Sequence, residues 1–272
     1  FIEGGRYLNI QIADGAVDGF SKIAGRNGFC IGKYKTSVNA SNVHVSVTGV
    51  APGVSLTRAA FRTAARTKGA KWSQQDTAAR FALALMYLVE YADWNSQAKI
   101  GRGYVDGNAA AENVGATDAL VYHTGMVQTA GGNGKSQIMY RGVESPWGNV
   151  WEFLDGINVS DRVPYICTAP ANFADDTAAN HTQAGYTCAQ ASGWQKTLGL
   201  DANMPWFLMA TAVGGSSTSF ITDSYQRAAG WRTVFVGGRF TSSDTAGLFA
   251  WDMGYGSSFT ADVVGSRLLF LP

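Results

Sequence analysis

The chain has 272 residues, of which 46% are hydrophobic and 12% aromatic, so it holds enough apolar material for a substantial core. Charged residues make up 15% and the formal net charge is +1, without the basic excess that a nucleic-acid groove or a membrane surface usually needs. The longest apolar run, FALALMYLV, is much shorter than the roughly 20 residues of a membrane-spanning helix. We therefore expect a globular protein with no nucleic-acid partner and no membrane insertion.

The N-terminal part of the chain has the pattern of short strands. YLNIQIA, which begins at Tyr7, and GFCIGKY, which begins at Gly28, have the short apolar patterns of strands. In NVHVSVTGV, three valines alternate with His44 and Ser46. This alternation predicts a strand with its valines on the inner face and with His44 half-exposed on the outer face.

The periodicity then changes and predicts a first helix near 55–68. Ser55 is a suitable N-cap, and a glycine follows the last periodic residue. Arg58, Arg62 and Arg66 are four residues apart and therefore share one face of this helix. We interpret that face as solvated, with an anion-binding stripe as the alternative.

A second helix is predicted near 73–91. Ser73 is a suitable N-cap, with Asp76 placed to reach back to it. The centre of the helix is apolar on all sides, which is typical of a buried helix. Glu90 lies near its end and needs either a partner or contact with water.

Helical periodicity disappears after about residue 100. PWFLMATAV from Pro205, WRTVFVGGRF from Trp231 and GSRLLFL from Gly265 predict core strands, separated by long polar loops. Two helices followed by irregular strands, with no linker and no repeat, predict one α+β domain over 1–272.

The three cysteines, Cys30, Cys167 and Cys188, are too few and too scattered for a disulfide framework or a metal cluster. We interpret them as small buried residues, with a bond between Cys167 and Cys188 as the alternative.

Motifs for cofactors give little support. TAGGNGKSQ has Thr129 where a phosphate-binding loop has its first glycine, and the pattern of a helix does not follow, so we expect a surface loop. His44, His123 and His181 lack the spacing of a metal site. The oxygen-rich stretches VDGNAAAEN and ADDTAAN leave calcium as an open alternative, without the spacing of a calcium loop. We expect no other cofactor.

The stretch RGVESPWGNVWEFLDGINV offers both acids and large aromatic residues. Glu152 and Asp155 are close enough in sequence to suggest a pair of catalytic carboxylates. Trp147 and Trp151 stand among glycines and asparagines, which favours core anchors beneath loops. We interpret the stretch as structural, with the two acids fixing loops or accepting hydrogen bonds from the indole N–H groups.

Within this stretch, GNVWEF resembles the GNVWEW signature of formylglycine-generating-enzyme-like domains, a branch of the C-type lectin fold. GFCIGKYKTS resembles an early strand of these domains, and WRTVFVGGRF and GSRLLF resemble their late strands, so the likeness extends in order over nearly the whole chain. The resemblance implies an α+β, C-type lectin-like fold with two helices and short irregular strands. The residues that it implies for the scaffold are Trp147, Gly148, Asn149, Trp151, Glu152, Gly237, Gly238, Gly247, Gly265 and Arg267.

MYLVEYADWNSQAKIGRG, YRGVESPWGNVWEFLDGINV and a C-terminal segment with GG, AGLF and GSRL in this order resemble a group of phage and prophage proteins with this fold. The group includes receptor-binding tail proteins and variable proteins of diversity-generating retroelements. That resemblance implies a non-enzymatic protein of the virion (phage tail) or of the bacterial cell surface. Its partner would be a protein or glycan receptor on a host or target cell, and a homo-oligomer is left open. The alternatives are a structural virion or tail-tip component and a metal-dependent oxidase. The oxidase branch needs two cysteines a few residues apart in the C-terminal half, and none follows Cys188.

The same resemblance places a ligand-display segment at 238–265. The segment mixes aromatic residues with small polar ones, a composition that paratopes also use. The alternative is that Phe249 and Trp251 belong to the core. The ligand-binding residues that the resemblance implies are Phe240, Thr241, Asp244, Ala250, Trp251, Asp252, Tyr255, Phe259 and Asp262.

Overall fold

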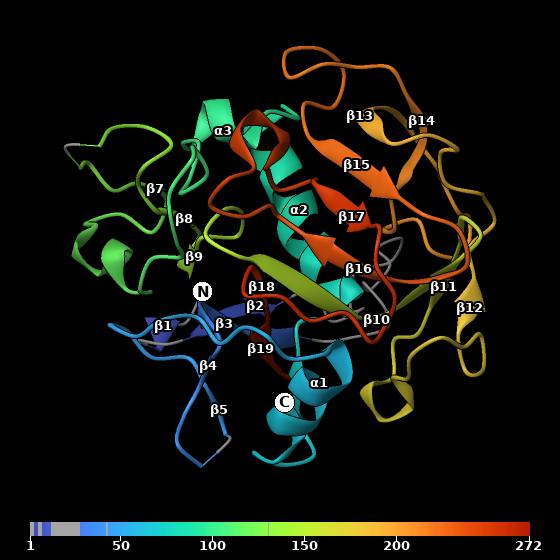
Figure 1. The fold of residues 1–272 in the computed structure, drawn as a ribbon, viewed down its shortest axis with the longest axis horizontal. Coiled ribbons are helices and arrows are strands. Elements are labelled where there is room, and N and C mark those ends of the chain that lie inside the picture. The colour runs from blue at the N-terminus through green and yellow to red at the C-terminus, as the bar shows by residue number, and fades with distance from the viewer. Residues whose placement is uncertain (1–2, 5–6, 12–27, 42, 130) are drawn as a thin grey trace.

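The fold combines two β-sheets with one long helix (Figure 1). The computed structural model describes residues 3–4, 7–11, 28–41, 43–129 and 131–272. Most regular structure in these residues is strand, and three α-helices accompany it, which confirms the expected α+β class.

The smaller sheet joins the two ends of the chain. Within the described residues it has five antiparallel strands in the order β1-β2-β3-β19-β6. The strands predicted from Tyr7, from Gly28 and within GSRLLFL are therefore confirmed. The strands are β1 (Glu3–Gly4), β2 (Tyr7–Gln11), β3 (Gly28–Lys35), β6 (Trp72–Gln74) and β19 (Arg267–Phe270).

The larger sheet has nine strands in the described residues and is mixed. Its order is β12-β11-β10-β16-β17-β15-β13-β14, and β18 pairs in parallel with β10. PWFLMATAV is a strand only from Ala210 onward. The strands are β10 (Trp151–Ser160), β11 (Val163–Ile166), β12 (Thr182–Gln183), β13 (Gly193–Leu198), β14 (Ala210–Val213), β15 (Ser224–Arg227), β16 (Trp231–Val236), β17 (Trp251–Met253) and β18 (Val264–Gly265).

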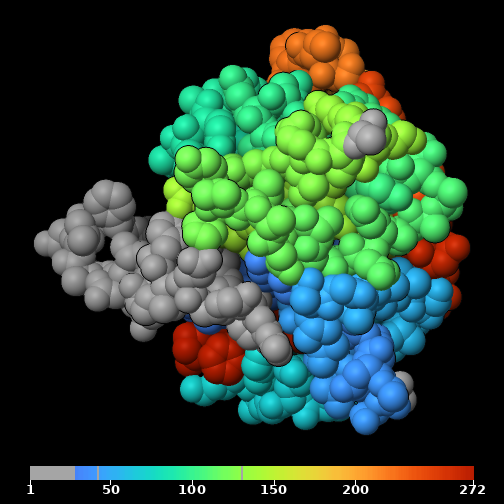
Figure 2. All heavy atoms as spheres, turned by 90° about the vertical axis from the view of Figure 1, so that its left-hand side faces the viewer, coloured from blue at the N-terminus to red at the C-terminus, as the bar shows by residue number. Residues whose placement is uncertain are grey.

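Shorter elements complete the fold. β4 (Ser37–Val38) pairs with β5 (His44–Val45), and β7 (Gly125–Met126), β8 (Ile138–Tyr140) and β9 (Val143–Glu144) form a small antiparallel sheet. This small sheet and the loops around it cover one side of the molecule (Figure 2). The loop TAGGNGKSQ leads into β8 rather than into a helix, in agreement with its rejection as a phosphate-binding loop. The 3-10 turns are η2 (Ala116–Ala119), η3 (Pro170–Asn172) and η4 (Ser243–Thr245).

Helix α2 (Thr77–Tyr91) runs behind β17, β16 and β10 (Figure 1). Its first two turns, Thr77 to Ala84, are buried, and the ring of Phe81 stacks on Trp251 of the sheet with centroids 5.2 Å apart. The N-cap is Asp76, which accepts a hydrogen bond from the Ala79 amide at 3.0 Å. The predicted cap Ser73 is wrong, because that residue belongs to β6.

Helix α1 (Arg58–Arg66) is capped by Thr57, whose hydroxyl accepts a hydrogen bond from the Ala60 amide. The predicted cap Ser55 is wrong by two residues, since it lies in a turn with φ of 62°. The third helix, α3 (Ser96–Lys99), is a single turn. No helix in the described ranges is long and apolar enough to cross a membrane.

The prediction for His44 is wrong. His44 and Ser46 are buried, whereas Val43, Val45 and Val47 are half-buried. The alternation is as expected, but helix α1 covers the histidine side of the strand, and the ring of Phe61 lies 5.2 Å from the imidazole.

Of the cysteines, Cys167 and Cys188 are buried, as expected, and Cys30 is half-buried. Cys188 is a free thiol, so the alternative disulfide with Cys167 is not formed.

Candidate functional site

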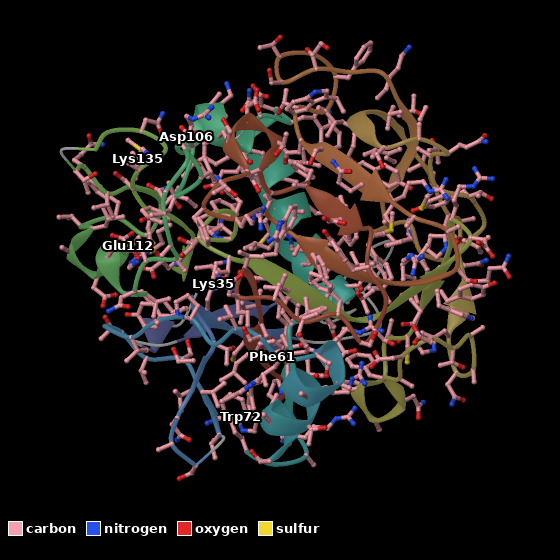
Figure 3. All side chains as sticks on the ribbon, in the orientation of Figure 1. Lys35, Phe61, Trp72, Asp106, Glu112 and Lys135 are labelled. Carbon is pink, nitrogen blue, oxygen red and sulfur yellow. The ribbon has the colours of Figure 1, made fainter. Side chains whose placement is uncertain are left out.

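Glu152 of β10 lies at the centre of a buried ion cluster. Its carboxylate is 2.6 Å from the Lys35 ammonium and 2.7 Å from the Arg267 guanidinium, and each side chain is only 1% exposed. Lys35 extends from β3 into the interior near the start of β10 (Figure 3). Arg267 also donates hydrogen bonds to the carbonyls of Gly32, Lys33, Glu144 and Ser145. One guanidinium thereby ties together β3, β9, β10 and β19.

The charges in this cluster keep Glu152 ionised. Burial alone would raise the pKa of Glu152, but Arg267 and Lys35 outweigh it and lower that pKa to about 2. Burial lowers the pKa of Lys35 to about 8, against the attraction of Glu152. A carboxylate held in this way is a structural counter-ion, because its lone pairs already have partners.

Trp147 is fully buried, as expected for an anchor. Its indole N–H donates to the carbonyls of Gly101 and Arg102, at 3.2 and 3.1 Å. The expectation that neighbouring acids accept from the indole is therefore wrong for Trp147, since the loop beside it supplies backbone acceptors instead. Trp151 is half-buried at the start of β10.

Asn149 connects the scaffold to the display segment. Its side-chain amide pairs with the backbone of Glu112 through two hydrogen bonds of 2.9 Å. Its carbonyl accepts from the Phe240 amide at 2.8 Å. The preceding Gly148 has φ of +78°, and a Cβ there would lie 3.0 Å from the backbone of Tyr104. The Gly-Asn pair is thus required by a close approach of three chain segments.

Asp155 fixes helix α1 to β10. Its carboxylate accepts two hydrogen bonds from Arg62, at 2.7 and 2.8 Å, and one from Gln74 at 2.9 Å. Asp155 therefore holds a helix and a strand, rather than the loops or indole N–H groups that the sequence predicts for it. Asp155 and Glu152 do not form the pair of catalytic carboxylates that their spacing suggests, because each binds its own cations.

The interpretation of the arginine stripe as a solvated face is wrong. Arg58 and Arg62 are buried, and both bind Asp175 in the loop after β11. Arg66 is half-buried and donates to the carbonyl of Pro170 in the same loop. The alternative of an anion-binding stripe does not fit either, because carboxylates and carbonyls from distant parts of the chain already bind these arginines.

The display segment leaves β16, forms η4, returns as β17 and ends at β18. Ala250 is fully buried and Trp251 is 3% exposed, so an outward ligand position does not fit either residue. The pairing of Trp251 with Val236 directs the indole toward α2, where it stacks on Phe81. Phe249 is buried as well, in agreement with the core alternative.

The opposite face of β16 and β17 carries the aromatic part of the segment. Tyr255 and Phe259 stack on each other with centroids 3.9 Å apart, and both rest on Phe235, at 5.7 and 5.6 Å. Tyr255 is 43% exposed. Asp252 accepts from the Gly254 amide at 2.7 Å, so its carboxylate shapes the turn that leads to Tyr255. Burial raises the pKa of Asp252.

The candidate ligand residues therefore differ in exposure. Phe240, Asp252 and Phe259 are half-buried, and the exposed ones are Thr241, Asp244, Tyr255 and Asp262. The first part of the segment lies beside the loop that holds Asp106, where Arg102 donates a hydrogen bond to Ser243. The second part lies beside Ser55 and Asp176. There the Ala261 carbonyl accepts from the Ser55 amide, and Ser257 donates to Asp176.

Asp176 belongs to the oxygen-rich stretch ADDTAAN, but nothing local in that stretch marks its contact with Ser257, 81 positions away.

Among the described residues, no group of three or more His, Cys, Asp or Glu side chains is arranged to hold a metal ion. The two oxygen-rich stretches use acids within the protein: Asp106 binds Arg102, and Asp175 binds Arg58 and Arg62.

Comparisons with known proteins add no assignment: no family model matches the chain, and no curated protein matches it.

Proposed function

We propose that the protein is a non-enzymatic binding protein that displays a ligand surface on a C-type lectin-like scaffold, like the phage and prophage proteins that it resembles. The observation that carries this proposal is the convergence of the quoted motifs. GFCIGKYKTS supplies Lys35, RGVESPWGNVWEF supplies Glu152, and GSRLLF supplies Arg267, and these side chains meet in one buried ion cluster. Glu152 and Arg267, which stand at matching positions of two of these motifs, are thus bound to each other, and Lys35 joins them from within the first motif.

This convergence supports a structural role for the motifs and leaves recognition to the outer surface. The backbone of the display segment is held at several points, including the Phe240 amide on the Asn149 carbonyl and the Thr233 amide on the Tyr255 carbonyl. A surface that is ordered before binding loses less conformational entropy when a ligand arrives. Side chains such as Thr241, Asp244 and Asp262 point outward and can vary without changing the core.

We further propose that the ligand is a protein or glycan receptor on a host or target cell, and that the protein belongs to a virion or a bacterial surface. Aromatic side chains with small polar neighbours suit either ligand, since rings supply contact area and the polar groups supply adaptable hydrogen bonds.

The test replaces Thr241, Asp244, Tyr255 and Asp262 together with alanine. Fluorescently labelled protein is incubated with a panel of bacterial cells and with a glycan array, and the same signals are measured for the variant. We expect a loss of at least ten-fold with a change in melting temperature of only a few degrees.

The matched control replaces Val121 and Tyr122, which are 86% and 78% exposed on another loop, with serine. This control should bind like the original protein. Binding that survives the fourfold substitution would remove the proposal.

A further inference from the structure

His44 is a buried imidazole without a hydrogen-bond partner among the described residues. Its side chain is 0% exposed, and neither Nδ1 nor Nε2 makes a hydrogen bond there. A neutral imidazole tolerates this environment far better than an imidazolium, which would lose its hydration without gaining an acceptor. Burial accordingly lowers the pKa of His44 to about 4.

The elements that pack around His44 do not compensate a positive charge. The hairpin of β4 and β5 carries no other titratable side chain. On α1, Arg58 and Arg62 are bound to carboxylates of other elements. Lys68, just after α1, is the charged group that acts on His44, and its positive charge further lowers the histidine pKa. Protonation therefore favours movement of the imidazole to water.

A continuous series of ring contacts leads from His44 to the display segment. The imidazole contacts Phe61 at 5.2 Å, Phe61 contacts Phe153 at 6.1 Å, and Phe153 contacts Phe235 at 4.7 Å between centroids. Tyr255 stacks on Phe235 at 5.7 Å. Phe61, Phe153 and Phe235 belong to one apolar cluster, so a change at one ring alters the packing of the next.

We propose that His44 is a pH-sensitive element whose protonation displaces the imidazole from beside Phe61 and thereby loosens the packing of Tyr255 on Phe235. The proposal goes beyond the binding function, because it concerns how the display surface responds to acid whatever its ligand. Two arrangements of one packed cluster, biased by a local charge, are a common basis of such switches.

The expected size of the effect follows from the two environments of the imidazole. Outside the core the histidine regains an ordinary pKa of about 6.5, whereas inside it the pKa is about 4. Acidification from pH 8 to pH 5 therefore favours the displaced arrangement by about thirty-fold. The change should develop between pH 6.5 and pH 4.

The test uses the full chain labelled with 3-fluorotyrosine and followed by fluorine NMR, with the Tyr255 signal assigned from Y255F. In the original protein, the Tyr255 signal should shift or broaden as the pH falls from 8 to 5. In H44F, which keeps a ring against Phe61 but cannot be protonated, the signal should stay unchanged. H44L serves the same purpose if H44F does not fold.

Tyr186, which stacks on Phe207 in an apolar cluster separate from that of Phe61, Phe153 and Phe235, is the internal control and should not respond. A Tyr255 signal that is constant down to pH 5, or that responds equally in H44F, overturns the proposal. So does loss of far-ultraviolet circular dichroism together with the Tyr255 change, since that marks global unfolding. No ligand enters the measurement, so its failure is distinct from failure of the binding function.

Discussion

Replacing Glu152 with glutamine should destabilise the fold strongly while leaving the display surface in place. The substitution keeps the shape of the side chain but removes the negative charge that binds Lys35 and Arg267 in the ion cluster, all three side chains being 1% exposed. Removing one partner of a buried ion pair costs about 3–5 kcal/mol, because the remaining charge stays desolvated. A domain has about 5–15 kcal/mol of total stability, so the loss is a large fraction of it.

The assay is urea denaturation at pH 7, with the unfolding midpoint and slope measured for each variant. E152Q should lower the midpoint at an unchanged slope. The matched control is E90Q, because Glu90 binds Arg141 on the surface with side chains 36% and 27% exposed and should contribute less than about 1 kcal/mol. K35M/E152Q removes one of the two cations that E152Q leaves without a counter-ion. The double variant should therefore lose less unfolding free energy than the sum of the losses of K35M and E152Q. A cost for E152Q below about 1 kcal/mol, or lost ligand binding at unchanged stability, would refute the structural role.

Three further predictions concern the pH dependence of stability and the hydrogen bonds of Asn149. Arg267 and Lys35 hold the pKa of Glu152 at about 2, below its ordinary value. The stability that ionised Glu152 contributes is therefore present above about pH 4.3 and is lost as the pH falls toward 2. In an acid titration of the unfolding free energy, E152Q should lack this loss. Burial raises the pKa of Asp223 to about 8, so the fold loses stability as the pH rises from about 4 toward 8, by on the order of 4 kcal/mol at pH 7. D223N should be more stable than the original protein at pH 7.5 and nearly equal at pH 4, and a parallel pH dependence of the two would contradict this. N149A should cost about 2–3 kcal/mol in thermal unfolding, because it removes two half-buried hydrogen bonds and places alanine at φ of 66°. N149G should recover the part due to φ, and equal losses would show that the backbone angle contributes nothing.

Several features of the fold could be predicted because they depend on local patterns. The strands that begin at Tyr7, Gly28 and Trp231 and the buried centre of α2 follow from hydrophobic periodicity. Helix starts were less accurate: both predicted serine caps are wrong, because Thr57 and Asp76 have equally suitable side chains and only the path of the chain selects between them.

The candidate surface could be predicted only in part. The composition of the display segment drew attention to Tyr255 and Phe259, which form the stacked aromatic pair on the outer face. The same composition drew attention to Trp251, which faces α2 instead. Aromatic residues occur both in cores and on binding surfaces, so composition does not tell which of them face outward. The pairing of β16 with β17 was needed to distinguish the buried Trp251 from Tyr255 and Phe259.

By itself the sequence determined which side chains share a face, as with Arg58 and Arg62 on α1, or His44 of β5 and Ser46 just after it, since helices and strands have set periods. Only the tertiary structure decided which of the faces is buried. The partners that bury them are remote in sequence: Asp155 is 93 residues from Arg62, and Glu152 is 115 residues from Arg267. Periodicity is a property of neighbouring residues, whereas burial and ion pairing depend on segments that meet only when the chain folds.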